Sequence, residues 1–327
     1  MSFLALAAGA LIQLASPEPP GPSTTAPTPP EPAPLVEEMA GVGTGTATVD
    51  GITDYYERMT VPVTIGGEGP FRFMIDTGAQ ATVLASSLAD QLALNDRRTA
   101  ILVGMASRQR IQTTEVPEFG IGKRMLTIQT APLVERGNIG GADGILGLDS
   151  LQGQRVLLDF VKDQISVADA SEIGRANGYE IVVKARRKLG QLIITDARVN
   201  GIATAVIVDT GAQGSIGNPA LLERLRGRDL GTTEMTDING QQLNGAVREG
   251  RLLELGNVQL RNFPIVFADS PPFHALGLGD TPALVLGMAE LRNFRRVAID
   301  FEKRRVLFDL PRGVRGPDWR RSTYGML

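Results

Sequence analysis

The stretch Phe73–Val83, FMIDTGAQATV, leads an apolar segment into Asp76-Thr77-Gly78-Ala79, and Val206–Ile216, VIVDTGAQGSI, does the same around Asp209. An aspartate placed directly after a buried strand is costly to keep charged, because desolvation opposes ionisation and raises the pKa of the carboxyl. A chain that does this twice is expected to use the two carboxyls together. The two copies therefore predict one shared site that contains Asp76 and Asp209.

The elements around this motif recur in the same order. A hairpin of apolar strands precedes each copy, and the second hairpin turns at Asn200-Gly201, a dipeptide typical of two-residue hairpin turns. A short helix is predicted after each copy. In the first half it is capped by Ser86 or Ser87 and reaches Leu94, and in the second half Asn218-Pro219 supplies the cap and the first helical residue.

The two halves also close alike. Ile145-Leu146-Gly147 is matched by Val285-Leu286-Gly287, and the later strand Val156–Phe160 is matched by Val297–Phe301. Several independent features that coincide in order are the signature of an internal repeat, with loops absorbing small differences in length. We therefore predict a mostly β protein with two lobes, each a small barrel-like unit, that meet at the two aspartates.

Composition narrows the chemistry that this site can perform. The 327 residues carry 33 basic and 36 acidic side chains, a net charge of −3, so the totals do not predict nucleic acid as a partner. There is no cysteine and a single histidine, His274, which excludes thiol nucleophiles, disulfides and His/Cys zinc clusters. No metal and no cofactor is expected, and the chemistry is predicted to come from carboxylates.

The first residues differ from the rest of the chain. Phe3–Ala15 is an apolar run of the length of a secretory leader, which predicts an extracytoplasmic protein, periplasmic or secreted. Pro17–Pro34 then holds nine of the chain's 20 prolines and predicts an extended spacer. The expected organisation is a signal peptide or membrane anchor at 1–16, a proline-rich linker at 17–45, lobes at 46–172 and 173–312, and a tail at 313–327.

Two facing aspartates can perform general acid–base chemistry. Like-charge repulsion at short range prevents both from ionising together, so they share one proton and titrate as a unit. The ionised carboxyl can then take a proton from water while the protonated one gives a proton to the carbonyl under attack. Such a pair can hydrolyse an amide without a covalent intermediate.

At this point the chain resembles the pepsin and retropepsin aspartic peptidases, over most of residues 60–310. The resemblance rests on the two Asp-Thr-Gly-Ala strands, on Asp143–Leu148 (DGILGL), and on Leu284–Gly287 followed by Leu291 and Asp300. The sequence DTGA, rather than DTGS, is similar to the bacterial retropepsin-like branch, here with both lobes in a single chain. Because the missing serine hydroxyl could have stabilised an ionised aspartate, we predict activity that extends towards neutral pH.

The resemblance implies roles for particular residues. Asp76 and Asp209 would be catalytic, and flap hairpins would cover an extended peptide substrate. Residues that support the site would be Thr77, Gly78, Ala79 and Gly147 in the first half and Thr210, Gly211, Ala212 and Gly287 in the second.

Candidate flaps follow each motif at a similar distance, and neither has the tyrosine of pepsin-like flaps. Their predicted substrate contacts are Gly104, Met105 and Ala106 in one, and Ile238, Asn239 and Gly240, after Asp237, in the other. Gln80 and Gln213, directly after each motif, could bind the substrate backbone or satisfy their own turns.

The predicted function is therefore aspartic endopeptidase. Two alternatives stay open: an inactive peptide-binding module of the same fold, and a protease that processes only its own chain. The expected partner is a polypeptide substrate, with no nucleic acid, and contact with a membrane is expected only through an N-terminal anchor. A monomer is expected because both aspartates lie in one chain.

Overall fold

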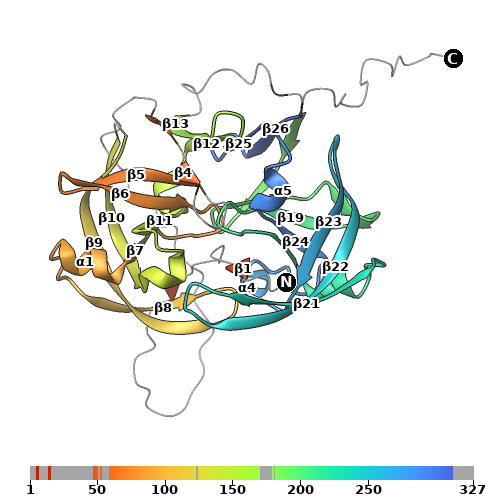
Figure 1. Ribbon diagram of the computed structural model, residues 1–327, viewed down its shortest axis with the longest axis horizontal. Helices are drawn as coiled ribbons and strands as arrows, with labels where there is room; N and C mark the ends of the chain where they lie inside the picture. The colour runs from red at the N-terminus through yellow and green to blue at the C-terminus, as the bar shows by residue number, and fades with distance from the viewer. Residues whose placement is uncertain are drawn as a thin grey trace, which may run out of the picture.

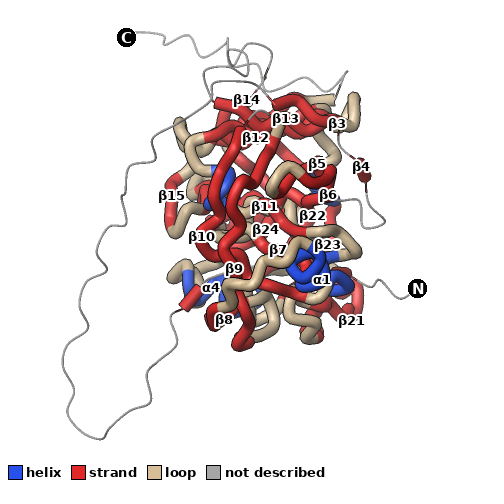
Figure 2. The backbone as a smooth tube through the Cα atoms, turned by 90° about the vertical axis from the view of Figure 1, so that its left-hand side faces the viewer, coloured by secondary structure: helices blue, strands red, loops and turns tan. Residues whose placement is uncertain are grey.

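The computed structural model describes residues 5–6, 14–15, 47–50, 52–53, 59–122, 124–169, 179 and 181–311. Strands dominate these ranges, and helices are few and short (Figure 2). The prediction of a mostly β, two-lobed protein is confirmed. The proline-rich stretch Pro17–Pro34, the tail 313–327 and most of the apolar leader lie outside the described residues.

The first lobe is built on one sheet with the strand order β2-β8-β9-β10-β7-β11-β6-β5-β4. A further pairing between β9 and β5, with Ile65 opposite Phe119, brings separate parts of this sheet together, and Phe73 packs edge-on against Phe119 in the core. The strands of this sheet are β2 (Leu14–Ala15), β4 (Ile52–Thr53), β5 (Met59–Ile65), β6 (Glu68–Ile75), β7 (Val83–Ala85), β8 (Arg98–Val103), β9 (Arg108–Ile121), β10 (Arg124–Val134) and β11 (Gly144–Leu146).

The second lobe repeats this plan in a sheet with the order β1-β21-β22-β23-β20-β24-β19-β16-β15, to which β17 and β18 are added. Figure 1 shows the two lobes side by side, the first in orange to yellow and the second in green to blue. The strands are β1 (Ala5–Leu6), β15 (Arg186–Lys188), β16 (Gln191–Ile194), β17 (Ala197–Val199), β18 (Ile202–Ala203), β19 (Ala205–Val208), β20 (Ser215–Gly217), β21 (Asp229–Thr236), β22 (Gln242–Leu255), β23 (Val258–Phe267) and β24 (Ala283–Leu286).

A third sheet joins the lobes. Its order is β14-β26-β25-β12-β13-β3, and the antiparallel β12–β25 pair places Leu157 of the first half opposite Ala298 of the second. In Figure 1 this sheet lies across the top of both lobes. Its strands are β3 (Ala47–Asp50), β12 (Gln154–Asp159), β13 (Gln164–Asp169), β14 (Ile181–Lys184), β25 (Arg296–Asp300) and β26 (Arg305–Asp309).

The helices lie at matching places in the two lobes. They are α1 (Ser86–Gln91), η1 (Arg136–Ile139), which is a 3-10 helix, and α2 (Leu148–Leu151) in the first lobe, and α3 (Pro219–Leu222), α4 (Pro271–Ala275) and α5 (Met288–Leu291) in the second. Within the described ranges, no helix has the length and apolar character needed to cross a bilayer.

The predicted repeat positions the two aspartates identically. In the first lobe β6 runs parallel to β11, and the Asp76 amide donates to the Leu146 carbonyl at 3.0 Å. In the second lobe β19 runs parallel to β24, and the Asp209 amide donates to the Leu286 carbonyl at 3.0 Å. Each aspartate thus begins the loop after a buried strand that is covered by the Ile-Leu-Gly or Val-Leu-Gly segment.

Some of the predictions for individual turns and helix ends are confirmed, and others are wrong. The Asn200-Gly201 turn forms with both residues at positive φ, and Asn218 caps α3 by accepting a hydrogen bond from the Leu221 amide at 3.0 Å. The prediction that Ser86 or Ser87 caps α1 is wrong. Ala85 is the N-cap residue and makes no side-chain bond, and the helix ends at Gln91 because Leu92 leaves helical geometry.

The segment Ser270–Thr281 contains helix α4. Pro271 and Pro272 occupy its first turn, where proline is well tolerated because the first helical amides have no partner within the helix. The hairpin predicted before Asp209 consists of four short strands, with β16 and β17 before the Asn200-Gly201 turn and β18 and β19 after it.

Candidate active site

The structure brings the two repeated aspartates together at the junction of the lobes. Asp76 is 0% exposed and Asp209 is 3% exposed. Each carboxylate is held by its own loop: Asp76 Oδ1 accepts from the amides of Gly78 (2.8 Å) and Ala79 (2.9 Å). Asp209 Oδ1 accepts from Gly211 (2.8 Å) and Ala212 (3.3 Å). One oxygen of each carboxyl is therefore fixed by two backbone donors.

The threonines of the two motifs tie the lobes to each other. The Thr77 hydroxyl donates to the Val208 carbonyl at 2.9 Å and accepts from the Thr210 amide at 3.2 Å. In the reverse direction, the Thr210 hydroxyl donates to the Ile75 carbonyl at 2.7 Å and accepts from the Thr77 amide at 3.1 Å. Four reciprocal bonds hold the two strand ends in register, which fixes the separation of the carboxyls.

Glycine is required in both motifs because each loop touches the opposite aspartate. A Cβ on Gly78 would lie 2.4 Å from Asp209 Oδ2, and a Cβ on Gly211 would lie 2.2 Å from the carboxyl carbon of Asp76. Such distances are far inside van der Waals contact. Only a residue without a side chain allows the carboxyls to approach.

The glycines Gly147 and Gly287 lie behind the aspartate loops. A Cβ on Gly147 would meet the backbone of Ala81 at 2.3 Å, and one on Gly287 would meet the Gly214 carbonyl oxygen at 2.5 Å. The next residue in each case closes the loop, because the Leu148 amide donates to the Ala79 carbonyl at 2.8 Å. The Met288 amide donates to the Ala212 carbonyl at the same distance.

Burial controls the protonation of the pair. Desolvation raises the pKa of Asp76 well above its usual range, and repulsion from Asp209 adds to the effect. Desolvation also raises the pKa of Asp209, but the amide of Gly211 and the Asp76 side chain oppose the shift. Among the described residues, Asp76 Oδ2 has no donor other than the neighbouring carboxyl. A proton shared between the two carboxyls satisfies this buried oxygen.

Further acids lie behind each aspartate loop, and these were not predicted. Asp149 accepts from the Thr82 hydroxyl at 2.6 Å, and burial raises its pKa against the effect of that bond. Glu290 accepts from the Ser215 hydroxyl at 2.6 Å, and burial raises its pKa to about 7 despite that bond. Thr82 and Ser215 occupy the same place in the repeat, six residues after each aspartate. This repeated hydroxyl was the sequence signal that could have pointed to Asp149 and Glu290.

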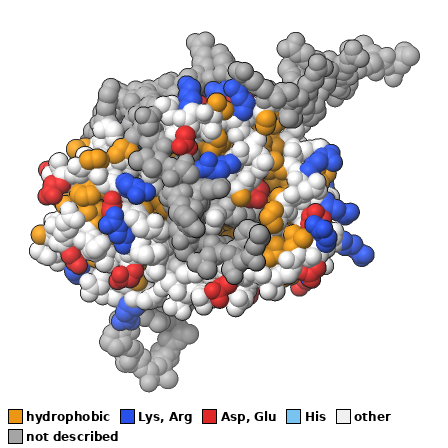
Figure 3. Space-filling model, viewed as in Figure 1, with side chains coloured by type: hydrophobic (Ala, Val, Ile, Leu, Met, Phe, Trp, Pro, Cys, Tyr) orange, Lys and Arg blue, Asp and Glu red, His pale blue; other side chains and the backbone are white. Residues whose placement is uncertain are grey.

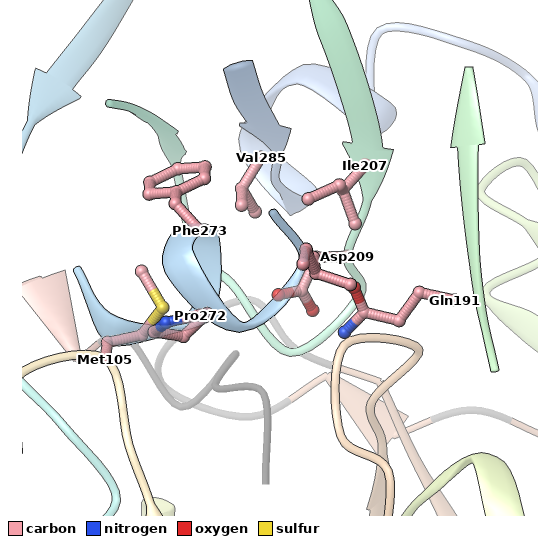
Figure 4. Close-up of a pocket in the computed structure, with 8 residues that line it drawn as sticks. Met105, Gln191, Ile207, Asp209, Pro272, Phe273 and Val285 are labelled. Carbon is pink, nitrogen blue, oxygen red and sulfur yellow. The ribbon is translucent and has the colours of Figure 1, made fainter. Parts of the chain in front are cut away.

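A pocket opens onto Asp209. It is lined by Met105, Gln191, Asp209 and the apolar side chains of α4 and the neighbouring strands (Figure 4). Gln191 was not predicted as a site residue. Its amide nitrogen donates to the Gly78 carbonyl at 2.6 Å, while its amide oxygen is buried without a partner among the described residues. The remaining lining residues are Ile207, Pro272, Phe273, Leu276 and Val285.

The candidate flap residues lie at the tips of two hairpins. Gly104, Met105 and Ala106 follow β8 in the hairpin β8–β9, here called the first-lobe hairpin. Ile238, Asn239 and Gly240 follow β21 in the hairpin β21–β22, here called the second-lobe hairpin. Met105 and Ile238 are both buried, and Met105 faces the pocket beside Asp209 (Figure 4).

The two glutamines after the motifs make different contacts. The Gln80 side chain donates to the Leu189 carbonyl at 3.0 Å, which connects the first lobe to the start of the second. The Gln213 carbonyl accepts from the Ala289 amide at 2.9 Å, and its side-chain oxygen is buried without a partner in the described part of the chain. The Gln213 side-chain oxygen is therefore free to accept a hydrogen bond, whereas the Gln80 side-chain nitrogen already donates one.

Residues 61–150 and 195–289, which contain both aspartate loops, match the model of a family described as aspartyl protease. The chain belongs to the aspartyl protease family. The two matched segments correspond to the two lobes, so this aspartyl protease has the two-lobed acid-protease fold with both halves in one chain. A search of curated proteins found no match.

The surface of this aspartyl protease has no dominant charge on the face seen in Figure 3, where acidic and basic side chains are interspersed around the grey, undescribed segment. In the ranges that the structure describes, no three acidic or histidine side chains gather as metal ligands would. His274 lies on α4 and bonds Asp269 at 2.7 Å on the surface, away from the two aspartates.

Proposed function

We propose that the protein is an aspartic endopeptidase in which Asp76 and Asp209 activate a water molecule against a peptide bond. The observation that carries this proposal is the pair itself: two buried carboxyls, each fixed through one oxygen by two amides, with the other oxygen of Asp76 left to the shared proton. Such a pair presents a base and an acid to one substrate.

The reaction follows from the protonation of the pair. We assign the resting proton to Asp76, whose pKa is raised furthest and whose Oδ2 lacks another donor. Asp209 then takes a proton from water as the water oxygen bonds to the carbonyl carbon, and Asp76 protonates the carbonyl oxygen. As the C–N bond of the tetrahedral intermediate breaks, the proton held by Asp209 passes to the departing nitrogen and one hydroxyl of the intermediate returns its proton to Asp76.

The substrate is proposed to bind as an extended strand beneath the two hairpins. Main-chain bonds to a hairpin edge give affinity, and alternate side chains enter pockets on either side. The pocket beside Asp209 has Phe273, Leu276 and Val285 in its wall, so the surface next to this carboxyl is mostly apolar.

The test compares the full chain with Asp76→Asn and Asp209→Asn on a peptide library between pH 3 and 7, with cleavage followed by mass spectrometry. Asparagine keeps the shape of the carboxyl but cannot share the proton, so each variant should lose at least about 1,000-fold in kcat/KM. Asp269→Asn, a change in an exposed carboxylate, is the matched control. Equal cleavage by all four proteins would refute the assignment, and peptide binding without any cleavage would favour the inactive binding module.

Rising pH should end activity as the pair loses its shared proton. Because the pKa of Asp76 is raised well above its usual range, the singly protonated pair persists to higher pH than an isolated aspartic acid. We expect the alkaline limb of kcat/KM to lie at a higher pH than the ordinary pKa of aspartic acid, which is about 4. A profile that peaks below pH 3 would contradict this.

One observation favours self-processing as a second activity. Strand β2 pairs antiparallel with β8, the edge of the first-lobe hairpin, and β1 pairs parallel with β21, the edge of the second-lobe hairpin. The N-terminal residues thus occupy edges that an extended substrate would use. We propose that the chain cuts itself between Ala15 and residue 46. Purified full chain should shorten at a rate independent of its concentration, and Asp76→Asn should stay intact.

A further inference from the structure

The tips of the two hairpins are joined by a single carboxylate. Asp237 begins the tip of the second-lobe hairpin and is only 1% exposed. Its Oδ2 accepts from the first-lobe hairpin, from the Ala106 amide at 3.1 Å and from the Ser107 hydroxyl at 2.7 Å. Its Oδ1 accepts from its own turn, from the amides of Asn239 and Gln241, both at 2.9 Å. Four donors therefore converge on one carboxylate, two from each lobe.

Neighbouring residues strengthen this junction. The Asn239 side chain donates to the Ser107 hydroxyl at 2.9 Å, so Ser107 both donates to and accepts from the second-lobe tip. A Cβ on Gly104 would lie 2.4 Å from Asp237 Oδ2, which shows how closely the first-lobe tip covers the carboxylate. Bonds to an ionised acceptor are stronger than bonds between neutral groups.

The junction also controls the position of Met105. The Met105 carbonyl accepts from the buried Ser270 hydroxyl at 2.6 Å, and its side chain lines the pocket beside Asp209. Because Met105 lies between Gly104 and Ala106 in the same tip, it cannot leave the pocket unless the bonds to Asp237 and Ser270 break. Residues of the second lobe, Asp237 and Ser270, thus help to hold the first-lobe tip over the pocket.

We propose that Asp237 is a positioning residue that fastens the first-lobe hairpin to the second-lobe hairpin and so sets how tightly the cleft closes on a peptide. The proposal deepens the proposed peptidase function and rests on it for its kinetic readout alone. Aspartate suits this position because asparagine cannot serve all four donors. If the oxygen of the asparagine accepts from the turn of residues 237–241, its NH₂ group faces the donors of Ala106 and Ser107. If the amide is flipped, the NH₂ group faces the donors of the turn instead.

The first measurement needs no activity. Because the chain has no cysteine, Gln109→Cys and Gln242→Cys, both at exposed positions near the two tips, can carry spin labels without background. The otherwise unaltered full chain should give one narrow distance distribution between the labels. Asp237→Asn should add a second, longer population. Asp229→Asn is the matched control, because Asp229 lies on the same hairpin and its side chain binds Gly231 and Arg248 of its own lobe.

The second measurement is kinetic. Asp237→Asn should raise KM for a cleaved peptide about tenfold with kcat changed less than about twofold, since the loosened tips bind substrate less well while the aspartate pair is untouched. Ser107→Ala, which leaves the turn of Asp237 intact, should raise KM about threefold. The double variant should be no worse than Asp237→Asn alone, because both changes remove the same junction.

The outcomes separate the two proposals. If no peptide is cleaved but the label distances respond to Asp237→Asn, the peptidase proposal fails and the junction stands. If the distances stay narrow in both Asp237→Asn and Ser107→Ala, the junction is overturned whatever the activity. A fall in kcat at constant KM, or a double variant with additive effects, also overturns it. If Asp237→Asn does not fold, Ser107→Ala tests the junction: a longer label distance and a raised KM support it, and unchanged values overturn it.

Discussion

The two lobes are nearly identical at the aspartates and differ immediately behind them. Asp76 and Asp209 follow matched strands and accept from matched amides, and the threonine after each aspartate donates to a carbonyl of the opposite strand in the same way. Behind the first loop lies Asp149, which receives bonds from Thr82 and Ser150. Behind the second lies Glu290, bonded to Ser215. The contacts that hold the two aspartates are thus repeated, while the acidic residues behind the two loops differ.

Two matched aspartates in the sheet that joins the lobes should differ most in their contribution to stability. Asp159 and Asp300 are equivalent in the repeat, and the Asp159 carboxylate accepts from the amides of its own turn, Val161 and Lys162. Asp300 is fully buried and binds Arg155 at 2.6 Å across the lobes and Arg305 at 3.2 Å. Asp300→Ala should lower the free energy of unfolding by about 3–5 kcal/mol, because it removes the carboxylate that the buried Arg155 guanidinium binds. Urea denaturation measures this, and Asp159→Ala is the control. Equal losses would show that the ion pair adds nothing.

Matched glycines test the symmetry of the aspartate loops. Gly78→Ala and Gly211→Ala each place a methyl group against the opposite carboxyl, so each should reduce kcat/KM by at least about 100-fold. Gly214→Ala, in the same loop as Gly211 but with open space around the new methyl, should stay within about twofold. A strong effect of only one of the first two variants would mean that the lobes contribute unequally.

The residue of the first lobe that matches Glu290 is Ser150, which has no carboxyl. We therefore expect Glu290 to make the free energy of unfolding depend on pH. Its folded pKa of about 7 lies above the ordinary 4.5, so the folded state binds more protons between these values. Stability is therefore lost as pH rises from about 4.5 to 7, by about 3 kcal/mol in total. Glu290→Gln should remove this loss and be more stable than the parent at pH 8 but not at pH 4.

The free energy of unfolding of both proteins across this pH range provides the measurement. Glu223→Gln, in an exposed residue after α3, controls for the loss of a charge. If the pH dependence of stability is the same in Glu290→Gln, it comes from other groups, and the aspartate pair would be examined first.

The smallest expected effects concern the threonines. Thr77→Val and Thr210→Val each remove one donated and one accepted bond between the lobes, so each should cost about 1–3 kcal/mol of stability. Because the bonds are reciprocal, the two losses should be equal within about 0.5 kcal/mol, and the double variant should cost less than their sum. Thermal denaturation of the three variants checks this, and unequal losses would break the symmetry.

The sequence predicted the repeated part of this site well, because repetition is visible without coordinates. Asp76, Gly78 and Thr77 stand in a motif that recurs with its flanking strands, so the meeting of the two lobes could be inferred from order alone. Asp237 and Gln191 could not be found in this way. Their partners, Ser107 and Gly78, lie more than 100 positions away, and no local pattern connects them.

What the sequence alone determined is the set of two aspartates, their loops and the barrel-like lobes that carry them, since alternating apolar strands, turn residues and an internal repeat are local properties of the chain. Only the tertiary structure decided which loops from opposite lobes meet. The closure of the hairpins through Asp237, the cover of Met105 over the Asp209 pocket and the buried Arg155–Asp300 pair all depend on how two packed lobes face each other. Contacts of that kind are set by packing between distant segments, which no short stretch of sequence encodes.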